Sequence, residues 1–197
     1  PVVLFRNYLQ WMMKNKYISA EMYACLKRYW GYAQFRPWQE DTVLAILDER
    51  ETLTILPTGG GKSLCFQLPA LLKDGMAVVI SPLISLMKDQ VDGLKDMGIP
   101  AECLNSSQGV AQQRSVIKRI RNAQVKLLYI SPERLQTEEM GELLNSVALS
   151  FFVVDEAHCI SHWVHDFRSE YRNLGNIRDN FPGLNIHAFT ATAAKAV

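Results

Sequence analysis

The chain has 197 residues, of which 48% are hydrophobic and 21% are charged, and its formal net charge is +1 at pH 7. This composition is typical of a globular protein of about one large domain, and it excludes a disordered chain or a protein with long apolar membrane spans. Because positive and negative charges nearly balance, overall charge neither favours nor excludes nucleic acid, and any such surface must be local.

The cysteines at positions 25, 65, 103 and 159 are far apart and include no Cys-x-x-Cys pair. This spacing argues against a zinc site and is typical of reduced thiols, so we expect an intracellular protein. The apolar and aromatic start of the chain lacks a cleavage site of the secretory kind. We predict that residues 1–25 form an N-terminal helical extension to a domain spanning residues 26–197.

Short β-rich runs then alternate with helical stretches. The runs lie at residues 52–56, 77–81, 126–131, 151–154 and 186–191. Several are almost wholly apolar, as strands covered on both faces should be, and their alternation predicts βαβ units. One predicted helix has a single face formed by Leu83, Leu86, Met87, Gln90, Leu94 and Met97, and another spans residues 110–121. The expected fold class is α/β, with a central, mainly parallel sheet and helices on both faces.

A glycine-rich stretch, PTGGGKS at residues 57–63, lies between a predicted strand and a helical pattern. This is the context that a phosphate-binding P-loop requires, and glycines let successive N–H groups turn onto phosphate oxygens. Lys62 would reach the β- and γ-phosphates, while Ser63 would hold Mg²⁺. The strict pattern begins with glycine, whereas Leu56 stands there, and we expect its side chain to enter the core. The predicted cradle consists of Thr58, Gly59, Gly60, Gly61, Lys62 and Ser63. The alternative is a glycine-rich turn that binds nothing.

An acidic pair, Asp155 and Glu156, follows the apolar run at residues 151–154. Open parallel sheets place their ligands at this end of their strands. We predict that Asp155 holds Mg²⁺ with Ser63 and that Glu156 accepts a proton from the attacking water, which makes Lys62, Asp155 and Glu156 the catalytic candidates. Taken alone, two acids also fit the first turn of a solvated helix.

Several motifs occur in an order that resembles superfamily 2 helicases: the P-loop, SPLISLMKDQV at residues 81–91, SPERL at 131–135, DEAH at 155–158 and TATA at 190–193. With WGYAQFRPWQ at 30–39 and CISHWVHDFR at 159–168, the chain is similar to the RecQ family of DNA helicases, over about residues 26–195. The resemblance implies the first RecA-like P-loop NTPase domain of such a helicase, with ATP and Mg²⁺ as cofactors.

The resemblance also assigns an adenine site. Tyr32 and Arg36 would sandwich the base and Gln39 would hydrogen-bond its edge, which suits an aromatic ring, a guanidinium plane and an amide. Local sequence alone also fits a helix that starts with Pro37 at its first position.

Contacts to the backbone of single-stranded DNA are implied for Ser81, Lys88 and Arg134, since such contacts need hydroxyls and cations. Lys88 is equally explained as a solvated charge, and Arg134 as a partner of Glu133. By the same resemblance, His158, Thr190 and Thr192 would couple the nucleotide site to movement of a second domain. Residues 105–107 fit any loop and stay unassigned.

The aromatic-rich loop of the family usually reads SQWGHDFRPEY, whereas this chain has SHWVHDFRSEY. The matching residues, expected to sense DNA by stacking and charge, are Trp163, His165, Phe167 and Arg168. They are otherwise explained as packing side chains. Val164 stands where the family has glycine, and because a β-branched residue is stiff we expect this loop to adopt a fixed conformation.

Members of the family carry a second RecA-like domain with an arginine finger, and usually zinc and winged-helix modules, none of which occurs in this chain. We therefore expect the chain alone to bind nucleotide but hydrolyse it poorly. The complete protein would translocate 3′ to 5′ on single-stranded DNA and open duplex junctions in repair and recombination. It would act at the nucleoid of a bacterium or in a eukaryotic nucleus, and not at a membrane. The alternative is a nucleotide-dependent module that binds DNA or a partner without unwinding.

Overall fold

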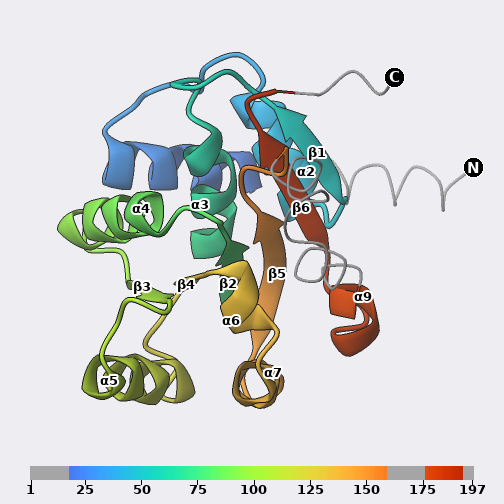
Figure 1. The fold of residues 1–197 in the computed structure, drawn as a ribbon. Helices are drawn as coiled ribbons and strands as arrows, with labels where there is room; N and C mark the ends of the chain where they lie inside the picture. The colour runs from blue at the N-terminus through green and yellow to red at the C-terminus, as the bar shows by residue number, and fades with distance from the viewer. Residues whose placement is uncertain (1–17, 159–175, 193–197) are drawn as a thin grey trace, which may run out of the picture.

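The computed structural model describes residues 18–158 and 176–192, and one sheet with helices on both faces lies within these ranges (Figure 1). Six parallel strands run in the order β1-β6-β5-β2-β4-β3. Their bounds are β1 Thr52–Ile55, β2 Met76–Ile80, β3 Ala101–Leu104, β4 Leu127–Ile130, β5 Leu149–Val154 and β6 Ile186–Thr190. The predicted α/β class and parallel sheet are confirmed.

Two apolar clusters show which helices cover which face. The bounds of the helices are α2 Gln39–Leu47, α3 Lys62–Leu72, α4 Ile84–Asp96, α5 Val110–Arg121, α6 Pro132–Leu135, α7 Glu138–Asn145 and α9 Asn176–Asn180. On one face, α2, α3 and α4 pack against strand residues such as Val79 and Val153. On the other, α5, α7 and α9 pack against the alternate residues Val78 and Phe152. This alternation is the two-residue period of strands buried on both sides.

A further helix covers residues 18–30, and its buried side chains Met22, Cys25 and Leu26 belong to the same core as α2 and α3. The predicted boundary after residue 25 therefore falls inside a continuous helix that packs on the domain. Residues 1–17 lie outside the described ranges. Among the described residues, no helix is both long enough and apolar enough to cross a membrane.

Three local expectations need correction. Strand β3 was not predicted, because its four residues form a sheet edge and include Glu102, whose carboxylate pairs with Lys95 and Arg119. Leu83 does not join the apolar face of α4: it is the N-cap residue and 46% exposed, while Val91 is buried there. The helix that follows Pro37 begins only at Gln39.

Candidate nucleotide and nucleic-acid site

The loop between β1 and α3 has the geometry of a phosphate cradle. Gly59 and Gly61 have φ of 79° and 80°, in the left-handed region that favours glycine. Leu56 is buried in the main core, as expected for the residue at the first position of the pattern. Helix α3 begins at Lys62, directly after Gly61, so its unpaired first-turn N–H groups and positive end lie at the loop.

The predicted adenine segment is hydrogen-bonded to this loop. Gln39 Nε2 donates to the carbonyls of Gly60 at 3.4 Å and Gly61 at 3.2 Å, and Gln39 Oε1 accepts from the Arg36 N–H at 2.8 Å. The Arg36 guanidinium donates to the Gly59 carbonyl at 2.7 Å. A Cβ on Gly61 would lie 2.3 Å from Gln39 Nε2. Arg36 and Gln39 therefore hold the loop in shape, a role that sequence reasoning missed.

Tyr32, the third residue of the predicted adenine site, is 51% exposed. An exposed ring is free to stack on a base. Gln39, by contrast, is only 4% exposed and uses both ends of its amide within the protein. To bind the edge of adenine, Gln39 must exchange at least one of these hydrogen bonds.

The acidic pair follows β5 and is fixed by backbone bonds on both sides. The Asp155 N–H donates to Ile80 O at 2.9 Å, and the Ala157 N–H donates to Phe189 O at 2.8 Å. Glu156, between them, has φ of 51°, an uncommon conformation for a residue with a side chain. Strained backbone of this kind costs on the order of 1–3 kcal/mol and clusters at functional sites. Here it turns the Glu156 carboxylate toward the P-loop lysine.

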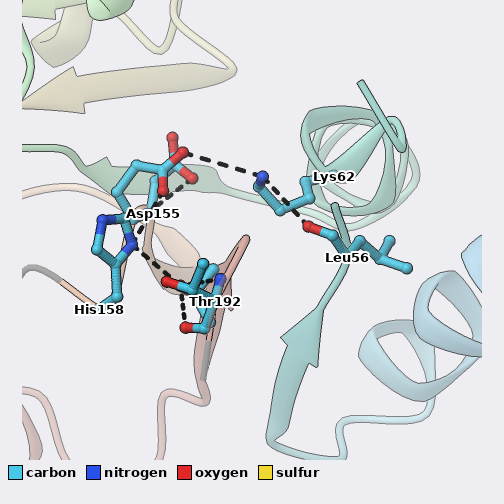
Figure 2. A network of polar contacts seen from close by, with 7 residues as sticks. Leu56, Lys62, Asp155, His158 and Thr192 are labelled. Carbon is cyan, nitrogen blue, oxygen red and sulfur yellow. Dashed lines mark hydrogen bonds and ion pairs between the residues drawn. The ribbon is translucent and has the colours of Figure 1, made fainter. Parts of the chain in front are cut away.

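A chain of polar contacts joins the P-loop to the end of β6 (Figure 2). Lys62 Nζ lies 3.4 Å from Leu56 O and 3.9 Å from Glu156 Oε1. Glu156 Oε2 lies 3.2 Å from His158 Nδ1, which lies 3.0 Å from Thr190 Oγ1. The sequence-predicted residues Lys62, Glu156, His158, Thr190 and Thr192 are thus brought together.

The direction of the hydrogen bonds fixes the histidine tautomer. The Thr190 hydroxyl donates to Thr192 O at 2.9 Å, so it accepts from His158 Nδ1. The ring proton therefore lies on Nδ1, where it also faces the Glu156 carboxylate. A structural change at Thr190 or Thr192 would be transmitted to Glu156 through the imidazole ring of His158.

Asp155 lies beside this chain and is 7% exposed. Burial and the nearby Glu156 charge raise the pKa of Asp155 to about 6, although the Glu156 N–H and Lys62 oppose the shift. A buried carboxylate that keeps a raised pKa is short of a cationic partner. With the Ser63 hydroxyl at the start of α3, it offers the hard oxygen ligands that Mg²⁺ prefers. The residues present therefore fit a magnesium ion shared with bound phosphates. Within residues 18–158 and 176–192, no group of three or more His, Cys, Asp or Glu side chains is arranged to hold a metal by itself.

The residues expected to contact DNA follow β2 and β4. Ser81 and Ser131 are each 1% exposed, and their hydroxyls have no hydrogen-bond partner among the described residues. Their strands are adjacent, and the Ser81 N–H donates to Ile130 O at 3.0 Å. A direct contact between Ser81 and DNA therefore requires this edge to open.

Lys88 is exposed on α4 and lines a polar cavity of ≈ 310 Å³. Asn105 and Ser107, from the stretch that the sequence left unassigned, also line it, together with Gln108. Asn105 Oδ1 accepts from the Ser107 N–H at 3.0 Å, so the loop is ordered by its own side chain. The cation, amides and hydroxyl of this lining have the chemistry of a phosphate-backbone contact, although the carboxylates of Asp92 and Glu102 also line the cavity.

Arg134, on α6, pairs with Glu139 at 2.9 Å and not with Glu133. Glu139 is well exposed, so solvent screens the pair and Arg134 can exchange it for a phosphate. Trp163, His165, Phe167 and Arg168 of the aromatic-rich loop lie outside the described residues, as does Val164.

Comparison with known proteins identifies the class of the chain. A family model described as DEAD/DEAH box helicase matches residues 36–197. The chain belongs to the DEAD/DEAH box helicase family, as its P-loop and DEAH stretch indicate. Within this family it is similar to RecQ helicases, and the resemblance inferred from its motifs is confirmed. It is 51% identical to the ATP-dependent DNA helicase RecQ of Haemophilus influenzae, over 85% of this chain and 27% of that protein.

Other relatives extend the likeness to distant organisms. The chain is 46% identical to the probable ATP-dependent DNA helicase RecS of Bacillus subtilis, covering 86% of this chain and 34% of that protein. It is 37% identical to the ATP-dependent DNA helicase Q1 of Rattus norvegicus, covering 100% of this chain and 32% of that protein. The chain thus spans about a quarter to a third of the length of these relatives.

Solved structures support the fold. The DUF1998 helicase MrfA bound to DNA aligns with a TM-score of 0.68 at 21% identity, over 88% of this chain and 25% of that one. The Mycobacterium smegmatis helicase Lhr, bound to single-stranded DNA and AMP-PNP, aligns with a TM-score of 0.66 at 22% identity, over 87% of this chain and 25% of that one. The predicted RecA-like architecture is confirmed.

Proposed function

We propose that the chain is the first motor domain of a RecQ-like ATP-dependent DNA helicase. In the complete gene product it would couple hydrolysis of Mg-ATP to 3′–5′ translocation on single-stranded DNA and to duplex unwinding in repair and recombination. The observation that carries the proposal is the polar chain from Lys62 through Glu156 and His158 to Thr190. It links the phosphate cradle to the end of β6.

Each residue of the nucleotide site has a separate role in ATP hydrolysis. Lys62 exchanges its contact with Leu56 O for the β- and γ-phosphates, while Gly59 to Gly61 direct N–H groups at phosphate oxygens. Ser63 and Asp155 would hold Mg²⁺, which would neutralise charge on the phosphates. Glu156 orients the attacking water and takes its proton, and its short distance to His158 keeps the carboxylate aimed.

Partners follow from the same proposal. Single-stranded DNA would lie across α4, the loop after β3 and α6, where Lys88 and Arg134 meet its phosphates. The aromatic-rich loop would report bound DNA to the acidic pair. A second RecA-like domain would complete the nucleotide site with an arginine finger, so this chain alone binds nucleotide but hydrolyses it slowly. The helicase would work inside the cell, at the nucleoid or in the nucleus.

Strand separation by the complete gene product tests the proposal. We expect a duplex with a 3′ single-stranded tail to be opened with ATP, and a duplex with a 5′ tail or a blunt end to be opened far more slowly. Replacing ATP by a non-hydrolysable analogue is the control and should abolish opening. Tight DNA binding with ATP but no strand separation would instead support a binding module.

A further inference from the structure

A group of three polar side chains lies inside the apolar core between α3 and α4. Gln67 Nε2 donates to Gln90 Oε1 at 2.8 Å and to Tyr129 OH at 2.9 Å. Gln67 is 5% exposed and Tyr129 is fully buried, and the residues around them are apolar. Burial raises the pKa of Tyr129, so its phenol stays protonated and accepts the bond from Gln67.

This group is not needed to fill the core. Replacing both partners of a buried hydrogen bond by apolar groups of the same shape is often nearly neutral, whereas leaving one partner unpaired is costly. A satisfied polar group in an apolar core instead fixes one arrangement of the elements that carry it. The elements joined here are α3, α4 and β4.

Helices α3 and α4 lie at the two candidate binding sites. Helix α3 begins at Lys62, so its orientation sets the P-loop. Helix α4 carries Gln90 close to exposed Lys88, and the polar cavity that Lys88 lines is the candidate contact for the DNA backbone. The Gln67–Gln90 hydrogen bond therefore connects the nucleotide-binding helix to the helix that faces DNA.

We propose that Gln67 and Gln90 are positioning residues that transmit the state of α4 to the P-loop through this bond. DNA bound against α4 would hold the helix in one place, and Gln67 would hold the start of α3 in the matching place. Neither residue touches substrate. The inference rests on the proposed helicase function, because it concerns how DNA binding changes ATP hydrolysis.

Two variants separate transmission from packing. Gln90→Met removes the bond from α3 to α4 and keeps the length of the side chain. Tyr129→Phe is the matched control, because it removes the other bond of Gln67, to the sheet, and leaves the link between the helices. Each variant leaves Gln67 with one partner, so both should lower Tm by about 2 to 4 °C.

The readout is ATP hydrolysis by the complete gene product with and without saturating single-stranded DNA. We expect Gln90→Met to reduce the stimulation by DNA about tenfold and to leave hydrolysis without DNA within twofold of the unmodified protein. Tyr129→Phe should keep its stimulation. Gln67→Met should lose stimulation to the same extent as Gln90→Met but have the lowest Tm of the three.

Equal stimulation in Gln90→Met and the unmodified protein would overturn the inference, and so would equal losses in Gln90→Met and Tyr129→Phe. The proposed function fails in a different way, when DNA does not stimulate even the unmodified protein.

Discussion

The carboxyl edge of the sheet divides into two halves that are built differently. The nucleotide half follows β1, β6 and β5, and its polar groups are joined to one another from Gln39 to Thr192. The DNA half follows β2, β4 and β3, where Lys88 is exposed and the Ser81 and Ser131 hydroxyls find no partner within residues 18–158 and 176–192. The polar groups of the nucleotide half contact one another, whereas two buried hydroxyls of the DNA half do not.

This difference determines whether the free-energy cost of each half falls at folding or at ligand binding. A preorganised site spends folding free energy in advance and loses little when the ligand binds. Strain at Glu156 and the buried Asp155 carboxyl are costs of that kind. The DNA half recovers its desolvation cost only when phosphates or a moved element supply partners. Changes in the nucleotide half should therefore alter the chemical step, and changes in the DNA half should alter affinity and stimulation.

The largest difference between the halves is expected at two lysines. Lys62→Ala removes the cation aimed at the phosphates, and ATP hydrolysis by the complete gene product should fall by about 10² to 10³-fold. Lys88→Ala is the matched control on the DNA half and should leave hydrolysis without DNA unchanged. Steady-state rates measure both. Similar losses of ATP hydrolysis in the two variants would contradict the distinction between the two halves.

The buried Asp155 carboxyl should make the nucleotide half less stable at neutral pH. Its pKa is about 6 in the folded protein and 3.8 when unperturbed, so the folded state binds a proton more tightly than the unfolded chain. The charged form therefore costs about 3 kcal/mol above pH 6, and the cost disappears as pH falls toward 3.8. Asp155→Asn should raise the free energy of unfolding in urea by up to about this amount at pH 7, with little gain near pH 4.

His187, on β6, is a control, because its pKa shift makes stability change with pH in the opposite direction. Burial lowers its pKa from 6.5 to about 4, and its Nε2 has no hydrogen-bond partner in the part of the chain that the structure describes. The unfolded chain binds the proton more tightly here, so stability is lost as pH falls from 6.5 to 4. His187→Gln should lose less stability over this window than the unmodified protein. If the free energy of unfolding of Asp155→Asn depends on pH in the same way as that of the unmodified protein, the Asp155 carboxylate does not destabilise the folded protein.

Substitutions at two glycines, one in the P-loop and one in α4, compare the two halves through their backbone conformation. Gly61→Ala places a Cβ at φ 80° and against Gln39 Nε2, so it should destabilise the protein by about 2 kcal/mol and weaken ATP binding. Gly93→Ala, in the last turn of α4, meets no atom of the described residues within 4 Å and should stabilise the protein by up to about 1 kcal/mol. Thermal unfolding and nucleotide titration measure both effects.

A modest effect is expected for DNA affinity. Lys88→Ala should weaken binding of single-stranded DNA by up to about tenfold and reduce the slope of log affinity against log salt by about 0.7. Lys118→Ala, on α5 and away from the cavity that Lys88 lines, is a control of the same charge. An unchanged salt slope for Lys88→Ala would show that this lysine is only a solvated charge.

Sequence patterns were most informative where local chemistry dictates geometry. The apolar runs predicted the central strands β2, β4 and β5, because strands buried on both faces have little freedom of composition. The β-rich runs also predicted β6 and the edge strand β1, although Leu53 and Ile55 of β1 are exposed. Helix α5 was predicted with its observed bounds. Strand β3 was missed because its Glu102 is stabilised by cations on two different helices, which a local pattern does not reveal.

The candidate site shows the same limit. Motif order assigned Lys62, Asp155 and Glu156, since each belongs to a short stretch of characteristic spacing. The bonds from Arg36 and Gln39 to the P-loop carbonyls join segments far apart in the sequence, and so do those of Gln67. Tertiary hydrogen bonds between common residue types leave no signature in a single sequence.

The most direct test of the account is single-turnover ATP hydrolysis by Glu156→Gln in the complete gene product, beside its affinity for ATP. The account predicts that hydrolysis falls by about 10² to 10⁴-fold while affinity stays within about threefold, because Glu156 acts on water and not on nucleotide binding. Glu138→Gln, in the exposed first turn of α7, is the control and should leave both unchanged. Hydrolysis by Glu156→Gln at the unmodified rate would contradict the account.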